Sequence, residues 1–180
     1  MQRCSYVDVH GTSYLVEMID RVGSPNGPTE PYPPQAFGIG EDEQLLGYYD
    51  LRYYQSFQSR CSILAEHAVN TVEEFRNTGY KIVGYGAAAK GVVFINATRT
   101  VLDYVIDDNP LKQGKFIPGR NIHVAAPDAL GQPGKTLFVI LAWNMKDEII
   151  GKIRKARPQD YPRFKGDRFL TCFPSVELTI

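Results

Sequence analysis

Apolar residues return along this 180-residue chain with two different spacings. Between residues 42 and 77 they recur at steps of three and four positions, which is the period of one face of an α-helix. This spacing predicts one long helix over residues 42–77, which ends near Asn77 and Gly79. We expect its apolar stripe to pack on the domain that follows. The stripe consists of Tyr54, Phe57, Cys61, Leu64, Ala65, Ala68, Val72 and Phe75.

After residue 77 the apolar residues form short runs, and helical segments fit between several of them. The run TLFVILA at residues 136–142 is apolar throughout, as is typical of a parallel strand covered on both faces. The alternation predicts an α/β fold, a Rossmann-like parallel sheet of about five strands in the order 3-2-1-4-5 with right-handed crossovers. The expected strands are residues 81–85, 101–106, 121–124, 136–142 and 168–173, and the expected helical segments are residues 87–97, 127–130 and 145–156.

The N-terminal part of the chain has its own pattern. Residues 4–21 read as two short strands around His10, and residues 23–41 are rich in proline and glycine with no apolar period. We therefore expect a β pair over residues 1–22 and a linker over residues 23–41. Residues 42–180 should form one structural domain that holds the long helix and the Rossmann-like sheet.

Charge and composition narrow the possible functions. Twenty basic side chains balance twenty acidic ones, so no overall field attracts the chain to nucleic acid or acidic membranes. No apolar stretch reaches the roughly 18 residues of a membrane helix, and the N-terminus lacks the apolar core of a signal peptide. Cys4, Cys61 and Cys172 are far apart, which predicts reduced thiols and no metal site. These features predict a cytoplasmic protein without a nucleic-acid or membrane partner.

The segment IVGYGAAAKG at residues 82–91 is the first candidate site. It contains the G-x-G-x-x-A pattern of dinucleotide-binding folds between a strand and a helix. There the first glycine makes the turn, the second lets a pyrophosphate approach the backbone, and the third small residue, here Ala89, lets helix and strand pack closely. A lysine in the first helical turn opposes the helix dipole and favours an anionic ligand. The candidate phosphate-binding residues are Gly84, Gly86, Ala87, Ala88 and Lys90. The alternative is a close-packed corner without a ligand.

Two later segments lie where open α/β sheets place their ligands, at the carboxyl ends of strands. Asp107 stands about 20 residues after the glycine turn, at the place of a ribose-binding acid, and an electropositive loop at residues 109–119 follows it. Trp143, the one tryptophan of the chain, ends a later strand and is a candidate for stacking on a base or sugar. The further substrate-binding candidates are Asp107, Asn109, Lys112, Gln113, Trp143 and Asn144. A solvated loop and a tryptophan that caps the core are the alternatives.

Four segments in order resemble the C-terminal domain of the sugar C-methyltransferases: VGYGAAAKG, DYVIDDNPLKQGKFIPGRNIHV, PDAL and FVILAWNMKDEI. Upstream, VDVHGTSYLVE resembles the family's V-H-G-G-S strand pair, with Thr12 in place of the second glycine. The chain departs from the family at VVFINATRT, where an Asn-Thr and an Asn-Tyr-Cys-Gly-like run are common. The resemblance covers nearly the whole chain. It implies enzymes that use S-adenosylmethionine to methylate a carbon of a nucleotide-linked keto-deoxysugar.

The resemblance also implies a division of labour. Family enzymes have an N-terminal zinc-binding domain, a central domain with the S-adenosylmethionine site and the acid/base residues, and this C-terminal domain. The chain has no zinc cluster and no cofactor loop, and its one Glu-His pair, Glu66 and His67, lies within the long helix. We therefore expect no catalytic residue, no metal and no cofactor bound by this chain alone. We expect a nucleotide-linked sugar as ligand, and a methyltransferase catalytic domain in cis or in trans as partner.

Two other functions remain open. A stand-alone Rossmann NAD(P)-binding protein or dehydrogenase is favoured by the glycine pattern and Asp107, but no proton donor is evident for a nicotinamide reaction. A non-enzymatic partner subunit of a split methyltransferase would keep the fold without the chemistry. His10 and His123 lie on strand-like segments and are expected to be structural.

Overall fold

The computed structural model describes residues 3–7, 13–17, 44–158 and 166–180, and for residues 3–7 and 13–17 it describes the backbone alone. The chain divides into two compact units, residues 1–60 and 61–180. In the first unit, β1 (Arg3–Val7) pairs antiparallel with β2 (Ser13–Glu17), which confirms the predicted β pair. The predicted turn around His10 and the linker over residues 23–41 lie outside the described residues.

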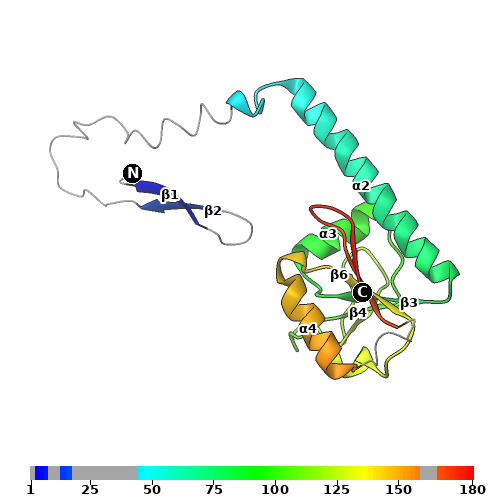
Figure 1. The fold of residues 1–180 in the computed structure, drawn as a ribbon. Helices are drawn as coiled ribbons and strands as arrows, with labels where there is room; N and C mark the ends of the chain where they lie inside the picture. Colours follow the sequence, from blue (N-terminus) through cyan, green and yellow to red (C-terminus); the bar gives the residue numbers. More distant parts are fainter. Residues whose placement is uncertain (1–2, 8–12, 18–43, 159–165) are drawn as a thin grey trace. The chain divides into compact units, whose positions relative to one another are not determined.

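The second unit is built on a six-stranded sheet in the order β5-β4-β3-β6-β7-β8. Figure 1 labels β3, β4 and β6 of this sheet. The strands are β3 (Lys81–Tyr85), β4 (Tyr104–Ile106), β5 (Val124–Ala125), β6 (Thr136–Ile140), β7 (Arg168–Thr171) and β8 (Glu177–Thr179). All neighbours pair in parallel except β8, which is antiparallel to β7. Counted from β3, the parallel strands follow the order 3-2-1-4-5. The predicted Rossmann-like sheet is therefore confirmed, and β8 is an additional edge strand.

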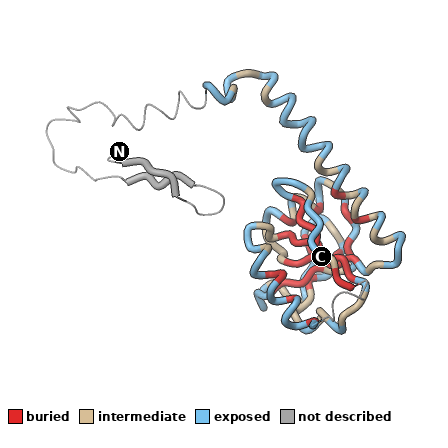
Figure 2. The backbone as a smooth tube through the Cα atoms, viewed as in Figure 1, coloured by how far each residue is buried: buried red, intermediate tan, exposed pale blue. Residues whose placement is uncertain are grey.

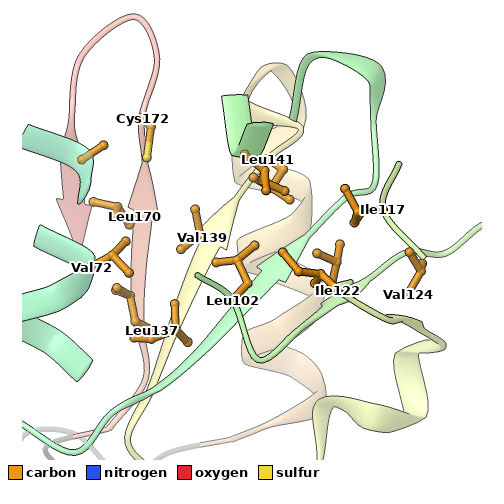
Figure 3. Close-up of a cluster of buried hydrophobic side chains, with 14 residues drawn as sticks. Val72, Leu102, Ile117, Ile122, Val124, Leu137, Val139, Leu141, Leu170 and Cys172 are labelled. Atoms are coloured by element: carbon orange, nitrogen blue, oxygen red, sulfur yellow. The ribbon is translucent and has the colours of Figure 1, made fainter. Parts of the chain in front are cut away.

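The central strands are apolar throughout because both faces of the sheet are covered. Successive side chains of a strand point to opposite faces, so Leu137 and Val139 of β6 join one buried cluster while Phe138 and Ile140 join the other. The first cluster includes residues of α2 (Leu51–Asn77) and α3 (Ala89–Thr98), and the second includes residues of α4 (Lys146–Ala156). Figure 3 shows the first cluster, with Val72 of α2 beside Leu137 and Leu170 of the sheet. The core thus has two layers, one on each side of the sheet.

The long helix differs from its prediction at its start and along its stripe. It begins at Leu51 rather than near residue 42. A left-handed Gly47, with φ of +78°, ends a short preceding turn, and the Asp50 carboxylate accepts the N–H of Arg52 at 2.8 Å. The C-terminal part of the stripe packs as predicted, with Ala68 and Val72 buried. The prediction is wrong for the N-terminal part of the stripe, which is exposed (Figure 2).

Several predicted strands are shorter in the structure. The second strand of the sheet begins at Tyr104 instead of residue 101, because the Asp103 carboxylate, and not a strand backbone, accepts the N–H of Ile82 at 2.8 Å. The third strand is Val124–Ala125 instead of residues 121–124. The short turn at Pro127–Leu130 is a 3-10 helix, η1, and a second one, η2 (Trp143–Met145), precedes α4. Each of these predicted elements is present in the structure, and the differences from the prediction concern only first and last residues.

A buried ion pair holds the C-terminal end of α4 against the start of β7. The Arg157 guanidinium donates two hydrogen bonds of 2.8 Å to the two carboxylate oxygens of Asp167, and both residues are at most 3% exposed. The same guanidinium donates to the Leu130 carbonyl and to the Thr136 hydroxyl, so few of its donors lack a partner. This fork-to-fork pair fixes the amino ends of β6 and β7. The loops that carry the candidate site lie at the opposite, carboxyl ends.

Candidate functional site at the carboxyl ends of the strands

The turn after β3 is made by Gly86. Its φ is +90°, a conformation that L-residues rarely adopt, and a Cβ there would lie 2.8 Å from the Ala142 Cβ. Its N–H donates to the Ile106 carbonyl at 2.7 Å, which ties the turn to the end of β4. Gly86 therefore brings the ends of three strands, β3, β4 and β6, into contact.

The two other glycines of the segment serve packing. Gly84 lies inside β3, where a Cβ would meet Leu102 and Val105 at 2.9 Å. Gly91, in the first turns of α3, is buried, and a Cβ there would meet the Leu141 Cβ at 2.6 Å. Ala89, predicted to be the close-packing residue, is exposed. The predicted register of the glycine pattern is therefore wrong by two residues: Gly86 makes the turn and Gly91 packs helix on strand.

This register places Ala88 where dinucleotide-binding proteins have their second glycine. Ala88 is the N-cap residue of α3, with extended backbone and no side-chain cap. The first N–H groups of α3 consequently have no capping side chain and point toward the carboxyl ends of the strands. The methyl group of Ala88 reduces the close approach that a dinucleotide pyrophosphate makes in the usual motif. The corner still presents backbone donors to an anion.

Asp107 connects the turn after β3 to the loop after β4 by hydrogen bonds. Its side chain is 8% exposed, and one carboxylate oxygen accepts both the N–H of Ala87 at 2.7 Å and the Lys112 ammonium at 2.9 Å. The other oxygen accepts the N–H of Asn109 at 2.9 Å. The carboxylate that sequence reasoning assigned to a ribose is thus already used by the protein.

The rest of the loop after β4 is organised around the same residue. Gln113 donates to the Asp107 carbonyl at 3.0 Å, and the Asn109 side chain accepts the N–H of Leu111 at 2.9 Å. The positive charge predicted for this loop is therefore partly neutralised, since Lys112 pairs with Asp107. Lys115 remains exposed.

A second group forms where β6 and β7 end. The Lys90 ammonium lies 5.8 Å from the centre of the Trp143 ring, and the Trp143 ring lies 5.2 Å from that of Phe173. Phe173 is 52% exposed, Trp143 is half-buried and Lys90 is exposed. Within residues 44–158 and 166–180, Lys90 forms no ion pair with a carboxylate. The group therefore combines an aromatic surface with an unneutralised positive charge.

Sequence reasoning missed the network beneath this edge of the sheet. The buried Tyr85 hydroxyl donates to Asp108 at 2.7 Å, and Lys152 of α4 donates to the same carboxylate at 3.1 Å. Burial raises the pKa of Tyr85 well above its ordinary value, and the hydrogen bond to Asp108 adds to this shift. Burial also raises the pKa of Asp108, but the bonds from Tyr85 and Lys152 outweigh it, so the net shift is downward. The network holds the end of β4 against α4, and the adjacent acids Asp107 and Asp108 were its sequence signal.

The predicted site residues thus fall into two groups. Asp107, Asn109, Lys112 and Gln113 contact one another and Ala87, while Lys90 and Trp143 contact each other. Gly84 lies inside the sheet, and Asn144 is exposed beside Trp143. Phe173 is the member of the second group that the sequence did not suggest. Among the residues whose side chains are described, no cluster of His, Cys, Asp or Glu could hold a metal ion.

Comparison with known proteins identifies the family. Residues 24–174 match the model of the C-methyltransferase C-terminal domain. Because the match covers most of the 180 residues, the chain belongs to the C-methyltransferase C-terminal domain family. The resemblance drawn from the sequence is confirmed.

A relative gives the scale of the longer proteins in which this domain occurs. The chain is 27% identical over 170 residues to the C-methyltransferase NovU of Streptomyces niveus. The alignment covers 93% of this chain and 38% of NovU, so the chain spans less than half the length of that relative. Within the described residues, no helix is long and apolar enough to cross a membrane.

Proposed function

We propose that this chain is the substrate-binding and scaffold domain of a sugar C-methyltransferase, and that it binds a nucleotide-linked deoxysugar without a methyl-transfer site of its own. The observation that carries the proposal is the group formed by Lys90, Trp143 and Phe173 beside the uncapped N-terminus of α3. We place the enzyme in the cytoplasm, where nucleotide-linked sugars are substrates.

The chemistry of a nucleotide-linked sugar matches this group part by part. Its diphosphate is an anion, which the first backbone N–H groups of α3, after its N-cap Ala88, and the Lys90 charge would stabilise. The N–H groups of Gly86, Ala87 and Ala88 themselves donate to Ile106, Asp107 and Gly86 and shape the turn. Its base or sugar presents a flat or apolar face, which would stack on Trp143. In this proposal Asp107, Asn109, Lys112 and Gln113 form the wall of the site and hold its backbone in place, with Asn144 at its rim.

S-adenosylmethionine fits these residues poorly. A Rossmann-type adenosine site uses the acid after the second strand to bind ribose hydroxyls, and here Asp107 already accepts hydrogen bonds from Ala87, Asn109 and Lys112. We therefore propose that the cofactor of the longer enzyme binds outside this chain. Calorimetric titration of the isolated chain with S-adenosylmethionine should give no saturable signal, and micromolar binding would contradict this part of the proposal.

The same two features weaken the alternative of an NAD(P)-binding protein, since Ala88 stands at the second glycine position and Asp107 is engaged. A partner subunit of a split methyltransferase would bind the same ligand. This alternative differs from the proposal only in that the catalytic domain would be a separate chain. Titration with NAD beside deoxythymidine diphosphate separates the first alternative from the proposal.

The test of the proposal is a comparison of two lysine substitutions. Lys90→Ala should weaken binding of deoxythymidine diphosphate by roughly 1.5–3 kcal/mol, the range for hydrogen bonds to charged groups, which is about 10- to 150-fold in Kd. The matched control is Lys135→Ala, which removes the same charge just before β6 begins, at the amino end of that strand. The control should bind as the parent does. If Lys90→Ala also binds as the parent does, the site does not lie at this corner.

A further inference from the structure

The apolar stripe of α2 continues beyond the part that packs on the sheet. Ala68 and Val72, in the C-terminal half, are each 1% exposed, whereas Tyr54 is 53% and Phe57 is 51% exposed. Steps of three and four residues keep these side chains, with the exposed Cys61 between them, on one face of a single unbroken helix. We call Tyr54, Phe57 and Cys61 the open stripe. Among the residues that the structure describes, nothing covers this continuation of an established packing face.

The composition around the open stripe is that of a protein interface. Residues 53–63, YYQSFQSRCSI, contain one charged side chain, Arg60, whereas residues 64–77 contain Glu66, Glu73, Glu74 and Arg76. Interface cores are depleted in charged residues and enriched in aromatic residues and arginine. Residues 53–63 thus carry fewer charges than the C-terminal half of α2, and no acidic one.

The segment before α2 extends the same character. Leu45 is 86%, Leu46 is 58% and Leu51 is 70% exposed. Of the charged residues between 44 and 52, Asp50 and Arg52 form an ion pair of 2.6 Å, whereas Glu41, Asp42 and Glu43 precede this segment. Contiguous exposed apolar side chains of this kind mark interaction surfaces in soluble proteins.

We propose that the open stripe is the face on which the remaining part of the longer methyltransferase docks. The match covers 38% of NovU, so the larger part of that relative lies outside the matched region and is available to cover this face. Permanent interfaces are more apolar than transient ones, and the low charge of residues 53–63 fits a permanent one. The proposal depends on the family and on α2, and it stands whether or not the corner at Lys90 binds a nucleotide-linked sugar.

Cys61 makes the proposal directly testable, because its thiol lies on the open stripe. The other cysteine with a described side chain, Cys172, is buried, and burial raises the pKa of its thiol to about 12, so it reacts slowly at neutral pH. With Cys4→Ser introduced, iodoacetamide labelling of the peptide that contains Cys61, measured by mass spectrometry, reports on this thiol in either protein. Labelling is compared between this chain alone and a chimera in which the part of NovU preceding the matched region is fused to the chain's N-terminus.

Cys61 labelling should be about tenfold or more slower in the chimera than in the isolated chain, because covered groups react only on local opening. The matched control is Ile63→Cys in a Cys61→Ser background, since Ile63 is 66% exposed and lies on the other side of the helix. That thiol should react equally in both proteins. Phe57→Glu in the chimera should restore Cys61 labelling, whereas Val93→Glu, at a 68% exposed position of α3, should not.

Three results would overturn the proposal. If Cys61 is labelled at the same rate in the chimera and in the isolated chain, the fused part of NovU does not cover the open stripe. Slow labelling in the isolated chain at every concentration would assign the stripe to residues of the same chain. Labelling that slows only as the concentration of the isolated chain rises would assign it to a second copy.

Discussion

The turn after β3 and the loop after β4 contact each other, but they use their polar groups in opposite ways. In the loop, Lys112 and Asp107 neutralise each other, and the Asp107 carboxylate also accepts backbone donors. In the turn, the N-terminus of α3 has no capping side chain and Lys90 faces an aromatic ring instead of a carboxylate. A polar group whose partner lies within the protein stabilises the fold, and one without such a partner is available to a ligand. This difference supports our proposal that the loop has a structural role and that the N-terminus of α3 with Lys90 binds the ligand.

The largest expected effect concerns the glycine that joins the two regions. Gly86→Ala should lower the free energy of unfolding by about 2–5 kcal/mol, because a left-handed L-residue costs roughly 1–2 kcal/mol and overpacking against Ala142 adds roughly 1–3 kcal/mol. Gly114→Ala is the matched control, since Gly114 has φ of +74° and open space around its Cα. Gly114→Ala should lower the free energy of unfolding only by the roughly 1–2 kcal/mol of the left-handed conformation. Urea unfolding measures both, and equal losses would show that the contact with Ala142 is unimportant.

The next effect separates two adjacent acids. Asp107→Asn should lower the free energy of unfolding by roughly 1.5–3 kcal/mol, because the amide cannot accept all the hydrogen bonds of this buried carboxylate. Asp108→Asn should cost less than about 1 kcal/mol, since the Asp108 side chain is 47% exposed and an amide oxygen can still accept the Tyr85 hydroxyl. Thermal unfolding of both variants measures the two losses of stability and shows which is larger. A larger loss for Asp108→Asn would mean that the loop is held from α4 and not from Asp107.

The smallest effect is that of the lysine in the loop. Lys112→Ala should reduce the free energy of unfolding by about 1 kcal/mol or less, because the Lys112 side chain is 40% exposed and its ion pair is partly screened. Binding of deoxythymidine diphosphate should match that of the Lys135→Ala control. A loss of binding as large as that expected for Lys90→Ala would move the site from the turn to the loop.

The sequence predicted the fold well because periodicity reports burial. Strands apolar on both faces and a helix with a regular stripe are encoded locally, so β6 and the C-terminal half of α2 were found directly. The register of the glycine turn was not predictable from the pattern alone. Gly84, Gly86 and Gly91 are all small, and only their contacts with Leu102, Ala142 and Leu141 show which one turns the chain and which ones pack.

The candidate site was predictable in its location but not in its partners. Strand order placed Asp107 and Trp143 at the carboxyl ends of the strands. That Lys112 would pair with Asp107, five residues away, while Lys90 would lie over Trp143, depends on loop geometry that residue types do not encode. Phe173 was missed for the same reason, because its contact with Trp143 joins residues from the ends of two different strands.

Trp143 provides the most direct measurement, because it is the one tryptophan of the chain and its fluorescence therefore reports on this site alone. We expect titration with a deoxythymidine-diphosphate sugar to change that fluorescence in a saturable way. Lys90→Ala should shift the titration to roughly 10- to 150-fold higher concentration, and Lys135→Ala should leave it in place. A nucleotide-sugar that binds by calorimetry without changing Trp143 fluorescence, or that does not bind at all, would contradict the assignment of substrate binding to this corner of the domain.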